Sequence, residues 1–176
     1  MPSVSDILDS MDYGPSPEQT THVTDWLARH KDGFGHFING AFVASSGKDW
    51  ISVDNPADGS RLGRVPQGTA ADVDAAVKAA RKAFPSWSKL PGYQRAKHLY
   101  ALARHIQKRE RFFAVLETMD NGKTIRESRD IDVPLVARHF YHHAGWAQLI
   151  NSEFPGYGPV GVVGQIIPWN FPLLML

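Results

Sequence analysis

The chain has 176 residues, of which 43% are hydrophobic and 21% are charged, and its formal net charge at pH 7 is +1. This composition is typical of a folded globular protein and excludes a disordered or collagen-like chain. The near-neutral charge argues against a protein that binds nucleic acid through a basic surface. The absence of cysteine excludes disulfides, cysteine-ligated zinc and a thiol nucleophile within these residues.

The N-terminus lacks the basic start and apolar run of a signal peptide, and no apolar stretch is long enough to span a bilayer. We therefore expect a cytoplasmic protein with neither a membrane nor a nucleic-acid partner. Residues 1–34 are expected to form a lead-in with a short helix over 21–30, and residues 35–176 to form the main folded unit.

Two pairs of short strands are predicted over residues 36–66. Asn39-Gly40 separates the first two apolar runs, and this dipeptide tolerates the positive φ angles of a tight hairpin turn. Strands at 50–53 and 62–65 flank a Pro-Ala-Asp-Gly turn. We expect the four strands to form one small antiparallel meander.

A helix is predicted to begin after Thr69, whose hydroxyl can accept a free backbone N–H, with Asp72 near the positive end of the helix dipole. We expect Pro85 to end this helix, because proline removes a backbone donor and crowds the preceding turn.

Two further helical segments follow. The second begins near Gln94, has a break at 108–110 and ends at Asn121-Gly122, which is typical of a helix C-cap. The third covers roughly 124–150, where Pro134 is expected to kink or restart it.

Residues 160–167 form a nearly continuous apolar run, which predicts a strand buried on both faces of a parallel sheet. Parallel strands are joined by long crossovers, and no second such strand follows in this sequence. Residues 171–176 are expected to be the first turns of a buried helix.

Three glycines and three histidines invite a site interpretation. The glycines precede the strand and lack dinucleotide-loop spacing, so we interpret them as allowing close packing. The histidines have helical spacing but no fourth ligand, so we predict an aromatic helix surface and no metal. These residues are Gly158, Gly161, Gly164, His139, His142 and His143.

Two carboxylate pairs, Asp130 with Asp132 and Glu117 with Asp120, could be acid–base pairs. Such pairs depend on convergence in a cleft, which sequence spacing does not show. We interpret all four as charges on helix surfaces.

Asn170 lies where the predicted strand ends and a helix begins, the edge at which open α/β sheets bind ligands. Its amide N–H is the type of donor that stabilises a developing oxyanion. Asparagine is equally suited to a turn or helix N-cap, so both interpretations stay open on the residues alone.

The sequence PVGVVGQIIPWNFPLLM (159–175) resembles the strand–turn–helix signature of the NAD(P)-dependent aldehyde dehydrogenase superfamily. Further segments match in order, and together they cover about four fifths of the chain. These are FINGAFVAS (37–45), NPADGSRLGRVPQ (55–67), DVDAAVKAARKAFPSWS (72–88), ETMDNGKTIRES (117–128) and HFYHHAGWA (139–147). The lead-in further resembles the family-sixteen branch.

The resemblance implies an α/β fold. Residues 35–176 would be the N-terminal part of a Rossmann-like cofactor domain, with β-hairpins, three long helical segments and the first inner parallel strand, incomplete as given. It also implies a reaction in which a cysteine thiolate attacks an aldehyde, hydride passes to NAD or NADP, and a glutamate-activated water releases the acid. The family's cysteine and glutamate lie beyond this chain, so the isolated chain is expected to be inactive.

By the same resemblance, Asn170 is the side-chain half of the oxyanion hole. Ile166, Ile167, Pro168 and Trp169 would line the cofactor cleft, with Trp169 beside the nicotinamide and ribose. The stretch between Trp146 and Val160 is shorter than in most relatives, which favours a homodimer over a tetramer. The alternative is a short non-catalytic protein that binds a dehydrogenase subunit or another partner through an unpaired strand at 160–167.

Overall fold

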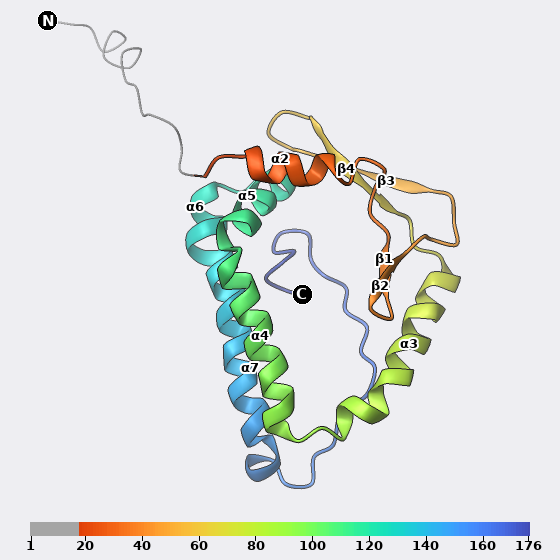
Figure 1. The fold of residues 1–176 in the computed structure, drawn as a ribbon, viewed down its shortest axis with the longest axis vertical. Coiled ribbons are helices and arrows are strands. Elements are labelled where there is room, and N and C mark those ends of the chain that lie inside the picture. Colours follow the sequence, from red (N-terminus) through yellow and green to blue (C-terminus); the bar gives the residue numbers. More distant parts are fainter. Residues whose placement is uncertain (1–17) are drawn as a thin grey trace, which may run out of the picture.

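The computed structural model describes residues 18–176. Helices α4 and α7 lie side by side along one edge of the molecule, with α3 opposite them and two β-hairpins at one end (Figure 1). The elements in chain order are α2 (Thr21–Ala28), β1 (His36–Ile38), β2 (Ala41–Val43), β3 (Trp50–Asp54), β4 (Arg61–Pro66), α3 (Ala70–Ser88), α4 (Gly92–Lys108), α5 (Glu110–Asn121), α6 (Ile125–Glu127), the π-helical turn η1 (Ser128–Asp132) and α7 (Val133–Glu153).

The strands form two separate antiparallel hairpins, β1–β2 and β3–β4. Asn39 and Gly40 have φ angles of 55° and 80°, so the predicted hairpin turn is confirmed. The prediction of one meander is wrong. The connection between the hairpins is held to the start of α3 instead, where Ser45 Oγ and Ser46 N donate to the Asp72 carboxylate at 2.7 and 2.9 Å.

Helix α3 begins as its sequence predicts. The Thr69 hydroxyl accepts a hydrogen bond from Asp72 N, and the Asp72 carboxylate accepts from Thr69 N, so the two residues form a capping box. The prediction that Pro85 ends the helix is wrong, because α3 continues to Ser88. Pro85 has no N–H to donate to the carbonyl of Arg81 one turn earlier, but the helix passes through it and continues for three more residues.

The predicted break between the next two helices is confirmed: α4 ends at Lys108 and α5 begins at Glu110. Gly122 caps α5 in the left-handed conformation, with φ 84°, as the Asn-Gly pair predicts. The third segment is divided into α6, η1 and α7. The π-helical turn ends directly before Val133-Pro134, so the helix restarts there.

The core lies between α4, α5 and α7. Small residues allow these helices to approach closely, and larger side chains from α5, α7 and the C-terminal residues close the space around them. The buried members are Ile106, Ala114, Val133, Val136 and Ala137, with Phe113, Ile125, Phe140, Leu173 and Leu174 packed against them.

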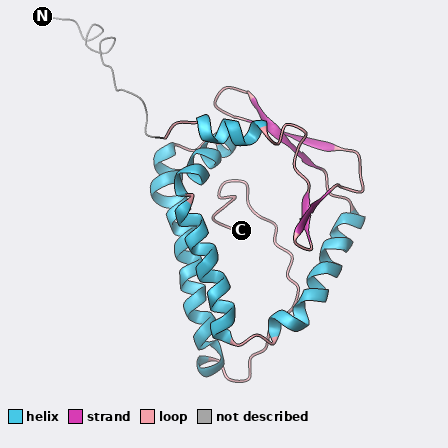
Figure 2. Cartoon of the chain, viewed as in Figure 1, coloured by secondary structure: helices cyan, strands magenta, loops and turns pink. Residues whose placement is uncertain are grey.

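Residues 160–167 are extended but form no strand, and Figure 2 shows this segment as loop. Val160 is 94% exposed and Ile166 is fully exposed. The predicted inner strand is therefore wrong for this structure. A strand needs backbone hydrogen bonds to a neighbour, and no strand within residues 18–176 pairs with this segment. No helix among the described residues is both long and apolar enough to cross a membrane.

Candidate functional site

The turn at residues 168–171 contains Asn170, for which a catalytic role is predicted, and two of the predicted cofactor-binding residues, Pro168 and Trp169. Trp169 is 85% exposed and Asn170 is exposed as well. The Asn170 amide has no hydrogen-bond partner in the part of the chain that the structure describes, so it does not cap a helix here. The following residues form a single turn, closed by Met175 N donating to the Phe171 carbonyl at 3.1 Å, and the predicted longer helix is absent from these residues.

Two side chains at the C-terminal end of α5 hold this turn in place, one from the last residue of the helix and one from the residue after its cap. Asn121 Nδ2 donates a hydrogen bond of 2.7 Å to the Trp169 carbonyl. Lys123 Nζ lies 3.7 Å from the centre of the Phe171 ring, a cation–π contact. Sequence spacing predicts no role for either residue, because each contact joins two residues that lie 48 positions apart.

Lys123 also forms an ion pair with Asp132. The Asp132 side chain is only 2% exposed, so its prediction as a surface charge is wrong. The wider π-helical turn places Asp132 and the fully buried Ser128 inward, where Ser128 Oγ accepts a hydrogen bond from Thr118 at 3.0 Å. Asp130 stays exposed and bonds Arg129 instead.

Glu117 is a second carboxylate whose predicted surface position is wrong, because it is only 5% exposed. Its Oε1 has no hydrogen-bond partner among residues 18–176. Burial raises the pKa of Glu117 above its ordinary value, the nearby Asp132 carboxylate raises this pKa further, and Lys123 opposes them. Asp120, its predicted neighbour on the surface, is exposed.

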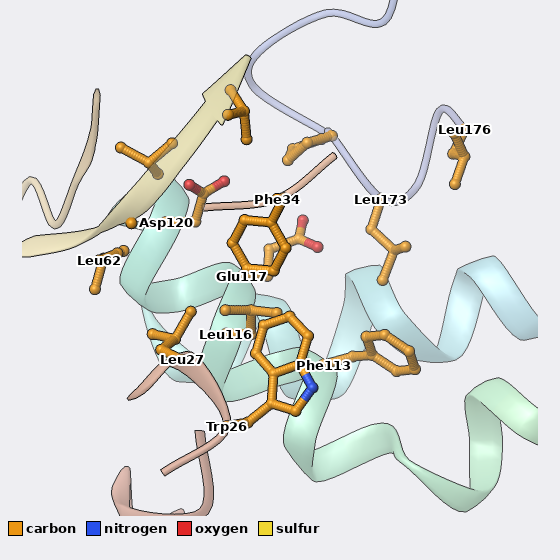
Figure 3. Close-up of a pocket in the computed structure, with 14 residues that line it drawn as sticks. Trp26, Leu27, Phe34, Leu62, Phe113, Leu116, Glu117, Asp120, Leu173 and Leu176 are labelled. Carbon is orange, nitrogen blue, oxygen red and sulfur yellow. The ribbon is translucent and has the colours of Figure 1, made fainter. Parts of the chain in front are cut away.

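A cavity of about 380 Å³ lies between α2, β4, α5 and the C-terminal residues (Figure 3). Its walls are almost entirely apolar, and the Glu117 and Asp120 carboxylates are the charged groups among its lining residues. Leu173 and Leu176 close one side of it. Asn170 and the predicted cofactor-binding residues 166–169 do not line it, so this cavity is not the candidate catalytic site.

The predictions for the three glycines Gly158, Gly161 and Gly164 and for the histidines of α7 have different outcomes. A Cβ atom built on any of the three glycines would meet nothing within 4 Å, so the prediction that they allow close packing is wrong. On α7, His142 contacts the rings of His143 and Trp146, which agrees with an aromatic helix surface. No cluster of three metal-ligating side chains occurs in the described part of the chain.

The predicted cofactor residues form a short strip of consecutive, mostly exposed apolar side chains at the end of the extended segment. Ile166 and Trp169 are almost fully exposed, Pro168 is exposed and Ile167 is half-buried. Such a strip suits the apolar face of a nicotinamide ring. No glycine-rich loop leading into a helix N-terminus, the usual phosphate site, accompanies it within residues 18–176. The residues present therefore fit one wall of a cofactor cleft.

The sequence model of the aldehyde dehydrogenase family matches residues 42–176, which include this turn and most of the fold. The chain belongs to the aldehyde dehydrogenase family. DhaS of Bacillus subtilis (strain 168), a protein named among the aldehyde dehydrogenases, is 42% identical over 151 residues, covering 79% of this chain and 30% of DhaS.

Solved structures agree with this assignment. HpcC from Thermus thermophilus matches 94% of this aldehyde dehydrogenase chain with a TM-score of 0.83 and 31% identity, over 35% of its own length. Betaine aldehyde dehydrogenase from Staphylococcus aureus in complex with NAD+ matches 89% of the chain with a TM-score of 0.78 and 34% identity, over 33% of its own length. The chain therefore spans about a third of the relatives that it matches, and the fold is the N-terminal portion of the aldehyde dehydrogenase fold.

Proposed function

We propose that this chain contributes the N-terminal part of an NAD(P)-dependent aldehyde dehydrogenase, which oxidises an aldehyde to a carboxylic acid. The observation that carries the proposal is the exposed Asn170 amide, free of partners among the described residues and held at a turn that belongs to the matched family region. The NAD+ complex of one similar enzyme supports the choice of a nicotinamide cofactor.

In this proposal the Asn170 amide donates a hydrogen bond to the aldehyde oxygen as that oxygen gains negative charge. A neutral donor at a preorganised position stabilises the charged transition state more than the uncharged substrate. A nicotinamide held beside residues 166–169 would supply the hydride acceptor. Residues 166–169 provide an apolar surface beside it and keep water from that side. The chain has no cysteine, so it requires the nucleophile of the rest of the enzyme.

The test replaces Asn170 in a complete enzyme that contains this segment. Asn170→Ala should lower kcat by about 10²–10³-fold, as the loss of one oxyanion donor does elsewhere, with little change in KM for the cofactor. Asn151→Ala is the matched control, because it removes an exposed amide at the far end of α7. An unchanged kcat in Asn170→Ala would show that the oxyanion role is wrong.

A second candidate function follows from the exposure of residues 160–167. Val160, Val163 and Ile166 are exposed apolar side chains without a strand partner among the described residues, and such an edge can pair with another chain. The chain would then be a non-catalytic protein that binds a dehydrogenase subunit. Light scattering of the purified chain mixed with a complete relative would detect that complex. The homodimer that we propose for the enzyme would be tested by light scattering of the complete enzyme alone.

A further inference from the structure

We propose that Asn121 and Lys123 are positioning residues, which orient Asn170 for catalysis by holding the residue on either side of it. This inference rests on the proposed function of Asn170. The two contacts are independent of each other in chemistry, since one is a neutral hydrogen bond and the other is a cation–π contact.

The hydrogen bond from Asn121 acts on the peptide unit that joins Trp169 to Asn170. Its acceptor is the Trp169 carbonyl, at 2.7 Å. Because the peptide unit is planar, fixing this oxygen also fixes the N–H of Asn170 and the direction in which its Cα enters the turn. The bond therefore limits the orientation of Asn170 without occupying the side-chain amide.

Lys123 acts on the opposite side, through the Phe171 ring at 3.7 Å from its ammonium nitrogen. The ammonium group is itself held by the buried Asp132 carboxylate. Gly122 stands between Asn121 and Lys123 in the left-handed conformation, which turns the chain where α5 ends. Two side chains, one on each side of the cap glycine, thus hold both neighbours of Asn170.

The Asn170 side chain remains exposed and has no partner within residues 18–176. A donor that is held by its backbone and left free at its amide is suited to bind an oxyanion, because little freedom is lost when the substrate arrives. Leu173 and Leu174, further along the chain, pack on the core, whereas the contacts of Asn121 and Lys123 are made directly to the residues next to Asn170.

The first experiment uses the 176-residue chain and does not depend on activity. Backbone ¹⁵N order parameters would be measured for Asn170 and Phe171 in the native chain, in Asn121→Leu and in Phe171→Leu, with Asn151→Ala as control. Phe171→Leu removes the ring while it leaves the Lys123–Asp132 pair intact. We expect order parameters of about 0.85 in the native turn and below about 0.6 in the two variants, with those of α7 unchanged. Unchanged values at Asn170 in both variants would overturn the proposal.

The second experiment uses the complete enzyme. Asn121→Leu should lower kcat about tenfold without changing KM for the cofactor, and it should cause no further loss when Asn170→Ala is already present, since residues that act as a unit are not additive. A loss of the same size in both backgrounds would indicate a merely structural role and overturn the proposal. If Asn170→Ala itself leaves kcat unchanged, the proposed function of Asn170 fails, and the order parameters still decide whether Asn121 and the Phe171 ring hold the turn.

Discussion

Gly92, the first residue of α4, lies directly against the backbone carbonyl of Ala147 on α7. A Cβ atom at position 92 would overlap this carbonyl oxygen. The contact joins the start of α4 to the last turns of α7, and these two helices form the most extensive packing between elements of the described chain. Glycine at this position therefore lets the two long helices approach closely at this end.

Gly92→Ala should destabilise the chain by about 1–3 kcal/mol, because the added methyl group forces the two backbones apart. Urea unfolding followed by circular dichroism would measure the change. Gly145→Ala on α7 is a matched control, since a Cβ there meets nothing within 4 Å and alanine should stabilise the helix by about 0.5–1 kcal/mol. Equal effects of the two substitutions would contradict the close contact at Gly92.

Asp72→Asn should lower the melting temperature at neutral pH. The Ser45 hydroxyl, followed by the backbone N–H groups of Ser46 and Thr69, holds the pKa of Asp72 well below its ordinary value of 3.8. Because the folded chain binds this proton less readily than the unfolded chain, the stabilisation is present above about pH 4 and is lost as the pH falls through the lowered pKa.

The difference in melting temperature between the native chain and Asp72→Asn should therefore narrow as the pH falls below about 4. Scanning calorimetry between about pH 7 and pH 2.5 would follow it. Asp74→Asn, an exposed position on the same helix, should show no comparable narrowing. A difference that stays constant over this range would mean that the Asp72 charge does not contribute to the cap.

Glu117→Gln should raise the melting temperature at pH 7. Burial and the Asp132 carboxylate raise the pKa of Glu117 above 4.5, so the folded chain holds this proton more tightly than the unfolded chain. Stability therefore falls as the pH rises from about 4.5 through the raised pKa. The variant has no such loss, and its advantage should vanish below about pH 4.5.

Thermal unfolding at pH 4 and pH 7 would test this sign, with Glu153→Gln as an exposed control at the end of α7. The control should change little at either pH. A melting temperature for Glu117→Gln that is lower than that of the native chain at pH 7 would show that the charged form is the stable one, with a partner for Oε1.

The purified 176-residue chain should have no dehydrogenase activity and weak or absent affinity for NAD. Only one apolar wall for the cofactor occurs in its described residues, and the chain has no cysteine. Isothermal calorimetry with NAD would check the affinity, and absorbance at the nicotinamide band would check turnover. Micromolar binding would contradict this expectation.

Local features of this protein are determined by the sequence itself. The Asn39-Gly40 turn, the capping box of Thr69 with Asp72 and the Gly122 C-cap each depend on residues at most a few positions apart. Hydrogen bonds of short range and the tolerance of glycine and asparagine for positive φ angles are enough to set them. The aldehyde dehydrogenase resemblance is likewise carried by contiguous motifs, which need no fold to be recognised.

The exposure of residues 160–167, the burial of Asp132 and the anchor of the candidate site depend instead on contacts, present or absent, between segments that are far apart in the sequence. Hydropathy predicts burial for residues 160–167, yet a strand also needs a neighbour, and these side chains are exposed where no described strand pairs with them. Asp132 is buried because the π-helical turn rotates it toward Lys123. The anchor of the candidate site, Asn121 on Trp169, joins residues 48 positions apart. Only the tertiary structure brings such groups together, because sequence spacing carries no information about which remote donor meets which acceptor.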